Sequence, residues 1–239
     1  MSGAGGGGSA GSSGRKLTRV PIQLEVEYRT TGNFLVAYST NLSKGGLFLQ
    51  TAQLLPMGAS LMIKIHVPGV DDPIDVDATV AWVRAEPTDE GHPAGMGLEF
   101  TGMEARYGEV IDRVVASFKG LRILVVGGPG PARSLVGRHL RSIVSCDILE
   151  LGAEGTLSLA AQQADLVVID VESTGKPGHE AVRSIKRTLK TPVIALAASD
   201  LEKVSALAAG ADEVLSSPPS FSELQSSVIR ALARPVRVG

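Results

Sequence analysis

The chain is poor in cysteine, in net charge and in long apolar runs. Cys146 is the only cysteine among 239 residues, which excludes an internal disulfide. No apolar run approaches the ~20 residues that a membrane-spanning helix needs. The 23 basic and 25 acidic residues leave a net charge of -2, which argues against a generally basic nucleic-acid-binding protein. Without a cysteine framework or a secretory leader, a reducing cytoplasm is the expected compartment.

The chain does contain enough apolar sequence for a sizeable core. Hydrophobic residues make up 44% and charged residues 20%, as in soluble globular proteins. A length of 239 residues fits one large domain or two ordinary ones. Residues 1–14, MSGAGGGGSAGSSG, are too rich in glycine and serine to pack, so we expect a flexible tail there.

In the first half of the chain the apolar residues recur with a period of two. This spacing is typical of strands with one buried face, and turn residues interrupt it at short intervals. Six short strands without a helix between them predict an all-β antiparallel barrel or sandwich. The expected strands are Val20–Tyr28, Phe34–Thr40, Gly46–Gln50, Ser60–Val67, Ile74–Arg84 and Gly95–Phe100.

A helix is expected directly after the last of these strands. Thr101 and Glu104 have the spacing of a capping box, and Lys119-Gly120 is a natural stop. The predicted apolar face of this helix comprises Tyr107, Val110, Ile111, Val114, Val115 and Phe118.

From Leu121 the pattern changes to short apolar runs separated by helix-length stretches. The runs are RILVV, CDILEL, DLVVID, PVIALA and DEVLS. Such alternation predicts an α/β domain with a mainly parallel sheet covered by helices on both faces. Its length fits a flavodoxin-like, doubly wound domain. The chain is therefore expected to comprise two domains, at 15–118 and 121–234.

Two short motifs near the N-terminus carry the most specific chemical suggestion. RKLTR places Arg15 and Arg19 just before a strand, and NLSKGG places Asn41, Ser43 and Gly46 between two later strands. Together they resemble the nucleotide-binding motifs of the PilZ family. The resemblance covers about residues 15–118 and extends to VPIQLEVEY, ATVAWV and GMGLEF in the same order. It implies a receptor for cyclic di-GMP rather than an enzyme; many members have Asp where this chain has Asn41.

The residue types suit such a ligand, which carries two phosphodiesters and two guanines. An arginine fork binds phosphate oxygens or guanine O6 and N7, and its face stacks on a base, so Arg15 and Arg19 are the expected clamp. Asn41 would pair with a guanine edge, and Ser43 would bond the base or a neighbouring backbone group. Gly45 and Gly46 would permit positive φ and a close approach of the backbone to the ligand. The sequence indicates no cofactor, and cyclic di-GMP is the expected ligand.

Other readings of the same residues remain open. The R-x-x-x-R spacing recurs at Arg183/Arg187 and at Arg230/Arg234, within predicted helices, where such pairs are ordinarily a solvated face. The Arg15/Arg19 pair therefore indicates a binding site only in combination with NLSKGG, because the two motifs occur in the order and at the distance typical of the family. Trp82 is expected in the core or at the barrel rim, and Arg84 would reach the ligand only if its strand borders the site.

The second half resembles a response-regulator receiver, with Asp170 at the phosphoacceptor position. Phosphoryl transfer to an aspartate needs carboxylates that hold Mg²⁺ beside it. The resemblance expects an acidic pair at Gly127 and Gly128, a hydroxyl at Ala197 and a lysine at Ser217, and this chain lacks all of them. It is therefore expected to be a pseudo-receiver that docks or dimerises, with Asp170 as a strand-end residue or helix cap.

Three further function classes compete with a non-enzymatic, cytoplasmic bacterial signalling receptor. They are a phosphorylation-dependent adaptor using Asp170, a nucleotide-dependent enzyme using GGPGPARS (127–134), and a ligand-free interaction scaffold. GGPGPARS follows a strand and opens a helix, but it lacks the Gly-Lys pair of a P-loop. The four histidines have no metal-ligand spacing, so no metal is expected.

The expected partners are cyclic di-GMP and a protein bound through the second domain, without nucleic acid or membrane. A homodimer is permitted. Ligand binding is expected to change the arrangement of the two domains.

Overall fold

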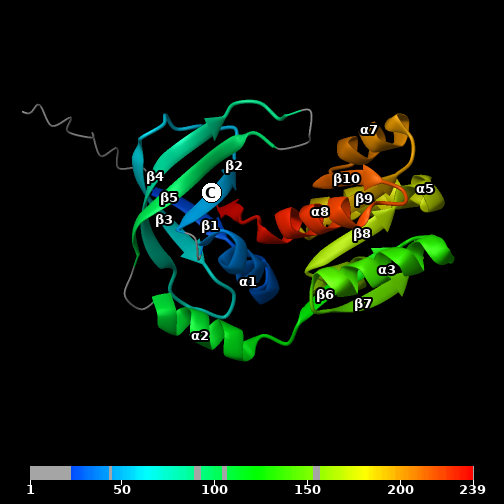
Figure 1. The fold of residues 1–239 in the computed structure, drawn as a ribbon, viewed down its shortest axis with the longest axis horizontal. Coiled ribbons are helices and arrows are strands. Elements are labelled where there is room, and N and C mark those ends of the chain that lie inside the picture. Colours follow the sequence, from blue (N-terminus) through cyan, green and yellow to red (C-terminus); the bar gives the residue numbers. More distant parts are fainter. Residues whose placement is uncertain (1–22, 43–44, 89–92, 104–106, 153–156, 239) are drawn as a thin grey trace, which may run out of the picture.

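The computed structural model describes residues 23–42, 45–88, 93–103, 107–152 and 157–238. Two sheets lie side by side along the long axis of the molecule, and the first is strongly curled (Figure 1). The two-part architecture expected from the sequence is confirmed: a curled sheet formed mainly by the first half, then a parallel sheet with helices.

The first sheet has six strands, in the order β11-β1-β3-β4-β5-β2. Its pairings are antiparallel except for β1 with β3, which run parallel, so the sheet is mixed rather than wholly antiparallel. The strands are β1 (Gln23–Glu27), β2 (Gly46–Gln50), β3 (Ser60–His66), β4 (Ile74–Arg84), β5 (Gly95–Met103) and β11 (Val236–Val238).

Alternation along these strands builds one hydrophobic core inside the curl. In β1, Leu24 and Val26 are buried while Glu25 and Glu27 are partly exposed. Ile63 and Ile65 on β3 repeat the pattern, as expected for residues two apart that share one face. Of the six strands predicted from the sequence, five correspond to β1 to β5.

The remaining predicted strand, Phe34–Thr40, is wrong, because this segment lies in helix α1 (Thr31–Thr40). Phe, Val, Tyr and Thr in the segment favour strands, but intrinsic propensity is a weak determinant that packing overrides. Thr30 caps the helix by accepting a hydrogen bond from Asn33 N–H at 3.1 Å. The helix then buries Phe34 and Ala37 in the core of the first sheet and packs on helix α8 (Phe221–Ala233) of the second domain.

The expected helix after β5 is present as α2 (Tyr107–Ser117), with Val110, Ile111 and Val114 buried. Two details differ from the sequence prediction. Thr101 lies within β5 rather than at a helix cap, and Val115 is 55% exposed. Glu104 lies outside the described residues.

The second sheet has five parallel strands in the order β10-β9-β8-β6-β7. In chain order this is 2-1-3-4-5, the arrangement of flavodoxin-like folds. The strands are β6 (Leu121–Val126), β7 (Cys146–Leu151), β8 (Leu166–Asp170), β9 (Val193–Ala197) and β10 (Glu213–Ser216). The helices are α3 (Pro131–Ile143), α4 (Leu157–Gln163), α5 (Val171–Thr174), α6 (Lys176–Thr188), α7 (Asp200–Ala208) and α8 (Phe221–Ala233).

Helices cover both faces of this sheet, so its central strands are continuously apolar. Helices α3 and α8 pack on one face, and α4, α6 and α7 on the other. Strands β8 and β9 are buried along nearly their whole length. The edge strand β7 instead alternates, with Leu149 52% exposed.

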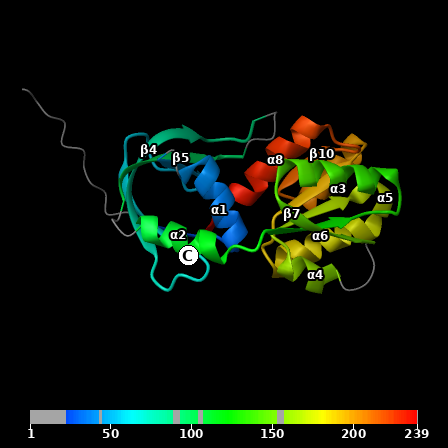
Figure 2. The same ribbon diagram turned by 60° about the horizontal axis from the view of Figure 1, so that its bottom comes forward.

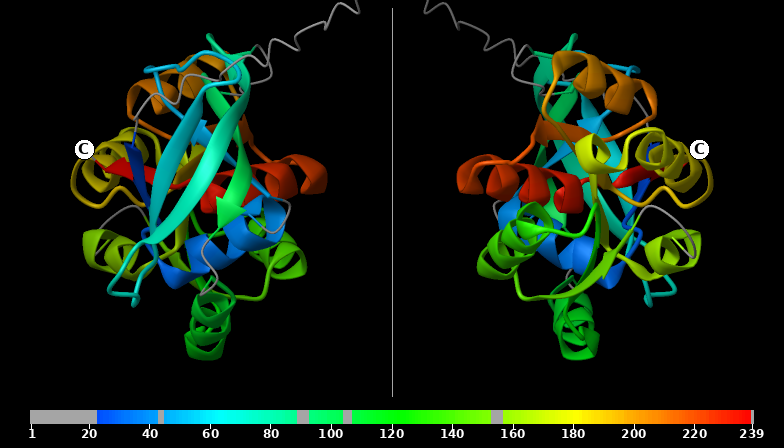
Figure 3. Two further views of the ribbon diagram at one scale, coloured as in Figure 1. Left: turned by 90° about the vertical axis from the view of Figure 1, so that its left-hand side faces the viewer. Right: turned by 90° about the vertical axis from the view of Figure 1, so that its right-hand side faces the viewer.

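The C-terminus returns to the first sheet, which the sequence did not suggest. Helix α8 leaves the second domain and lies beside α1 (Figure 2), and Ala233 near its end belongs to the first core. Strand β11 then pairs antiparallel with β1, for example Val26 with Arg237. Figure 3 shows the C-terminal strand beside the first strand. The two domains are therefore joined at residues 118–120 and again through α8 and β11.

Candidate functional site

A pocket of ≈ 250 Å³ lies where α8 reaches the first sheet. Its walls come from the end of α1, from β2 and β4, and from the C-terminal half of α8, so both domains contribute. The lining residues are Thr40, Asn41, Phe48, Trp82, Arg84, Pro93, Ile229, Arg230, Ala233 and Arg234.

Two stacked aromatic rings form one wall of the pocket. The Phe48 and Trp82 ring centroids are 5.3 Å apart and their planes differ by 11°. Both residues pair with Gly97, which lies between them on β5. A Cβ at Gly97 would lie 2.1 Å from Trp82 Nε1, so the absence of a side chain allows the indole to lie across the strand. Trp82 remains 42% exposed, which leaves an aromatic surface open to a ligand.

Arg84 lies against the same aromatic pair. Residues two apart on a strand share a face, and Arg84 Cζ is 5.2 Å from the Trp82 ring and 5.9 Å from the Phe48 ring. Its Nη1 donates to the Pro93 carbonyl at 3.2 Å. The cation–π contacts and this hydrogen bond hold a positive charge beside the exposed indole.

Another part of the lining carries two arginines, Arg230 in the last turn of α8 and Arg234 as its C-cap residue. Arg230 Nη2 lies 2.8 Å from Glu213 Oε2, and Arg234 also pairs with this carboxylate. Two guanidinium charges against one carboxylate leave one net positive charge on this wall.

Asn41 is the residue through which the predicted motifs reach the pocket. It caps the C-terminus of α1, its N–H donates to the Ala37 carbonyl at 2.8 Å, and its carbonyl accepts from Gly46 N–H at 3.3 Å. Gly45 has φ +80°, the positive φ expected for this turn. A Cβ at Gly46 would lie 2.8 Å from the Leu98 carbonyl oxygen, so this glycine allows β2 to approach β5.

The other predicted ligand residues cannot be placed in the pocket. Arg15, Arg19 and Ser43 lie outside the described residues. Sequence reasoning named Asn41 and singled out Trp82 and Arg84, which the structure brings together, but it missed Phe48. It also treated Arg230 and Arg234 as an ordinary helix surface, because their R-x-x-x-R spacing is shared with Arg183 and Arg187 and does not distinguish the two pairs.

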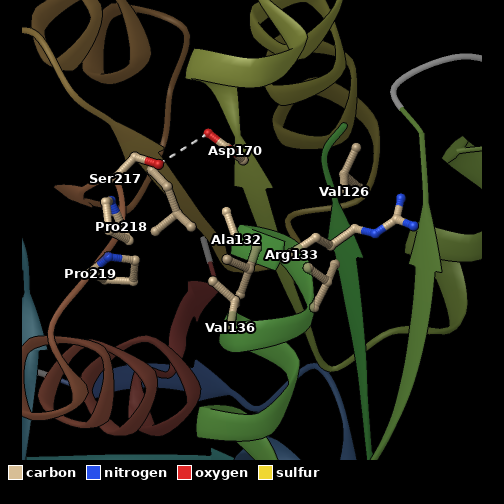
Figure 4. Close-up of a pocket in the computed structure, with 11 residues that line it drawn as sticks. Val126, Ala132, Arg133, Val136, Asp170, Ser217, Pro218 and Pro219 are labelled. Atoms are coloured by element: carbon tan, nitrogen blue, oxygen red, sulfur yellow. Dashed lines mark hydrogen bonds between the residues drawn. The ribbon is translucent and has the colours of Figure 1, made fainter. Parts of the chain in front are cut away.

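Asp170 lies in the second domain and caps helix α5. Its Oδ1 accepts a hydrogen bond from Ser173 N–H at 3.3 Å. It also accepts one from the Ser217 hydroxyl at 3.4 Å, which Figure 4 shows. The adjoining cavity of ≈ 10 Å³ is about the size of one water. Arg133 on its wall turns away and pairs with Glu150 Oε2 at 3.0 Å.

Glycines stand directly beside this aspartate. A Cβ at Gly127 would lie 3.3 Å from Asp170 Cβ, so the position expected to bear an acidic group is adjacent but carries no side chain. Among the described residues that line the cavity, Asp170 is the one carboxylate. The arrangement supports the sequence interpretation of Asp170 as a strand-end helix cap.

The described part of the chain offers little other chemistry. It contains no group of three or more His, Cys, Asp or Glu side chains that could hold a metal ion. Burial raises the pKa of the Cys146 thiol, which disfavours the nucleophilic thiolate at neutral pH. No described helix is both long and apolar enough to cross a bilayer.

Comparison with known proteins separates the chain into the same two parts. Residues 14–117 match the family model of the PilZ domain. The transcriptional regulatory protein CpxR of Escherichia coli (strain K12) is 37% identical over 115 residues, which cover 47% of this chain and 49% of that protein. KdpE, the KDP operon transcriptional regulatory protein of the same organism, is 37% identical over 82 residues, which cover 34% of this chain and 36% of that protein. The chain thus spans half or less of the length of these curated relatives.

Solved receiver domains also align with about half of the chain. The signal receiver domain of a DNA-binding response regulator (merR) from Colwellia psychrerythraea 34H is 20% identical, with a TM-score of 0.40, covering 46% of this chain and 96% of that one. The BeF3-activated DrrB receiver domain is 27% identical, with a TM-score of 0.41, and the match covers 48% of this chain and 99% of that one.

Proposed function

We propose that this chain, a PilZ domain followed by a receiver-like domain, is a non-enzymatic signalling receptor that binds cyclic di-GMP in the pocket beside Asn41. The observation that carries the proposal is a shared location. Asn41, from the N-x-S-x-x-G motif, lines the same pocket as Trp82 and Arg84. A motif residue, a base-stacking surface and a fixed cation therefore meet at one place.

The pocket chemistry suits a guanine carrying a phosphodiester. Trp82, which is 42% exposed, offers aromatic surface for stacking, since every base has a π-face that an indole can cover. The Asn41 amide can both donate to and accept from a guanine edge. Arg84 would lie beside the stacked base and attract the phosphate.

The N-terminal arginines complete the proposed site. Arg15 and Arg19 precede β1 by a few residues, and both are expected to contact the bound ligand. Their forks would bind phosphate oxygens and guanine O6 and N7.

Calorimetric titration of cyclic di-GMP into the full chain tests the proposal. Micromolar or tighter binding is expected, lost in Arg15→Ala/Arg19→Ala and weakened in Asn41→Ala. The linear dinucleotide with the same bases is the matched control ligand and is expected to bind more weakly. Absence of heat with the wild-type chain at high protein concentration contradicts the proposal.

The second domain is proposed to act on a protein partner without phosphorylation. Glycine at 127 and 128, alanine at 197 and serine at 217 remove the groups that would hold Mg²⁺ and the phosphoryl group. Because residues of both domains line the pocket, bound ligand is expected to favour one relative arrangement of the two domains. Small-angle scattering with and without cyclic di-GMP measures this bias, and superimposable profiles at saturation contradict it.

A further inference from the structure

The R-x-x-x-R spacing of the N-terminal pair recurs at Arg230 and Arg234, near the end of α8. Arg230 lies in the last turn of α8 and Arg234 is its C-cap residue, and both contact Glu213, so the two side chains lie on one side of the end of α8. That side lines the pocket that contains Asn41. The two side chains are 34% and 17% exposed, so they are neither solvated nor sealed in the core.

A single carboxylate positions both guanidinium groups. Glu213 on β10 is 6% exposed and contacts Arg230 through Nη2 at 2.8 Å, while its other oxygen contacts Arg234. Ser227 Oγ accepts a further bond from Arg230 Nη2 at 2.9 Å. These contacts fix the side chains before any ligand arrives, which lowers the entropic cost of binding.

Donor groups remain on both arginines. A guanidinium carries five N–H donors. In the bonds between described residues, Arg230 uses Nε and Nη2, and Arg234 uses Nη1 and Nη2. Arg230 Nη1 and Arg234 Nε therefore stay available for an acceptor in the pocket.

We infer that α8 of the receiver-like domain supplies Arg230 and Arg234 as a phosphate-binding wall of the cyclic di-GMP site. The inference rests on the proposed function. Arg230 and Arg234 line the same pocket as Trp82 and Arg84, so a ligand stacked on the indole would bring its phosphodiesters near the surplus positive charge at the end of α8. The PilZ domain alone would then form an incomplete site, and bound ligand would tie the last helix of the second domain to the first.

The test is calorimetric titration of cyclic di-GMP into the full chain and into Arg230→Ala. Arg234 stays with Glu213 in this variant, so the buried carboxylate keeps a cationic partner. Loss of a charge-assisted hydrogen bond at this partly exposed position is expected to raise Kd about 10-fold. Arg183→Ala/Arg187→Ala is the matched control: the same spacing on α6, with both residues exposed and away from the pocket, and its Kd is expected to be unchanged.

A conservative variant separates a ligand contact from a folding effect. Arg230→Lys keeps the charge beside Glu213 but lacks the fork, so its Kd is expected to fall between those of the wild type and Arg230→Ala. Wild-type Kd in both Arg230 variants, with the wild type binding well, overturns this inference and leaves the proposed function standing. A wild-type chain that binds no cyclic di-GMP overturns both.

Discussion

The Thr30 hydroxyl, at the N-terminus of α1 in the first domain, donates a hydrogen bond to the Asp165 carboxylate in the second. The other oxygen of Asp165 accepts the backbone N–H of Arg122 at 2.7 Å, and Asn33 Nδ2 donates to its carbonyl at 3.4 Å. Asp165 is 7% exposed. One buried carboxylate thus fastens the helix cap of one domain to the first strand of the other, close to the chain connection.

Asp165→Asn is expected to lower the free energy of unfolding by about 1–3 kcal/mol, because one of two buried donors loses its acceptor. Burial lowers the pKa of the nearby Arg29, and the negative charge of Asp165 opposes that shift. The variant therefore also removes a charge that stabilises the protonated Arg29 guanidinium. Denaturant unfolding measures the change. Asp147→Asn, at an exposed position on β7, is the control, and equal losses in both variants would contradict the role given to Asp165.

Trp82→Ala is expected to weaken cyclic di-GMP binding because the stacking surface is lost. Stacking of a base on an aromatic side chain contributes ~1–3 kcal/mol, so Kd should rise about 5- to 150-fold. Calorimetric titration measures it. Met57→Ala, which alters a 70% exposed side chain outside the pocket, should bind as the wild type does. Unchanged affinity in Trp82→Ala would place the base elsewhere.

Asp170 is expected to take up no phosphoryl group from acetyl phosphate, because it is the one carboxylate among the described residues that line its cavity, and Gly127 and Gly128 supply no acidic pair. Amide NMR spectra recorded with Mg²⁺ and beryllofluoride should match those of the untreated protein. Label that is incorporated by the wild type and lost in Asp170→Asn would restore the phosphorylation-dependent adaptor as the better account.

The capping box of α8 predicts a pH-dependent stability. Ser220 and Glu223 bond reciprocally, and the Ser220 hydroxyl, followed by its backbone N–H, lowers the pKa of the exposed Glu223 carboxyl. Because the folded pKa is the lower one, this contribution is present above the ordinary pKa of glutamate and is lost as pH falls through the folded value. The Glu223 pKa in an NMR titration should rise in Ser220→Ala.

The same variant should lose about 0.5–2 kcal/mol of stability at neutral pH, and the loss should shrink in acid. Ser226→Ala, exposed on the same helix, is the control. A Glu223 pKa that is equal in the wild type and in Ser220→Ala would contradict the capping account.

Local patterns predicted most of both sheets. Alternation identified β1 and β3 to β5, and continuous apolar runs identified the buried strands of the second sheet. The segment Phe34–Thr40 failed because β-forming side chains occupy a helix that is decided by the Thr30 cap and by packing against α8. Strand β11 was missed because three residues carry no periodicity, and its partner β1 lies at the other end of the chain.

The candidate site was predicted only in part, for a similar reason. NLSKGG identified Asn41 because turn chemistry is local. The Phe48–Trp82 wall depends on three paired strands, in which Gly97 on β5 lies between Phe48 on β2 and Trp82 on β4, and no single segment of the sequence records this pairing. Arg230 and Arg234 enter the pocket only because α8 crosses to the first sheet, so their spacing alone could not distinguish them from Arg183 and Arg187.

The central claim is that cyclic di-GMP binds in the pocket between the first sheet and α8, and Trp82 reports on it directly. Trp82 is the one tryptophan of the chain, so intrinsic fluorescence comes from the pocket wall. Titration with cyclic di-GMP is predicted to give a saturable change in this emission, which GMP does not reproduce at equal concentration and which Arg15→Ala/Arg19→Ala abolishes. Emission that stays constant while calorimetry records binding would place the ligand outside this pocket and contradict the account.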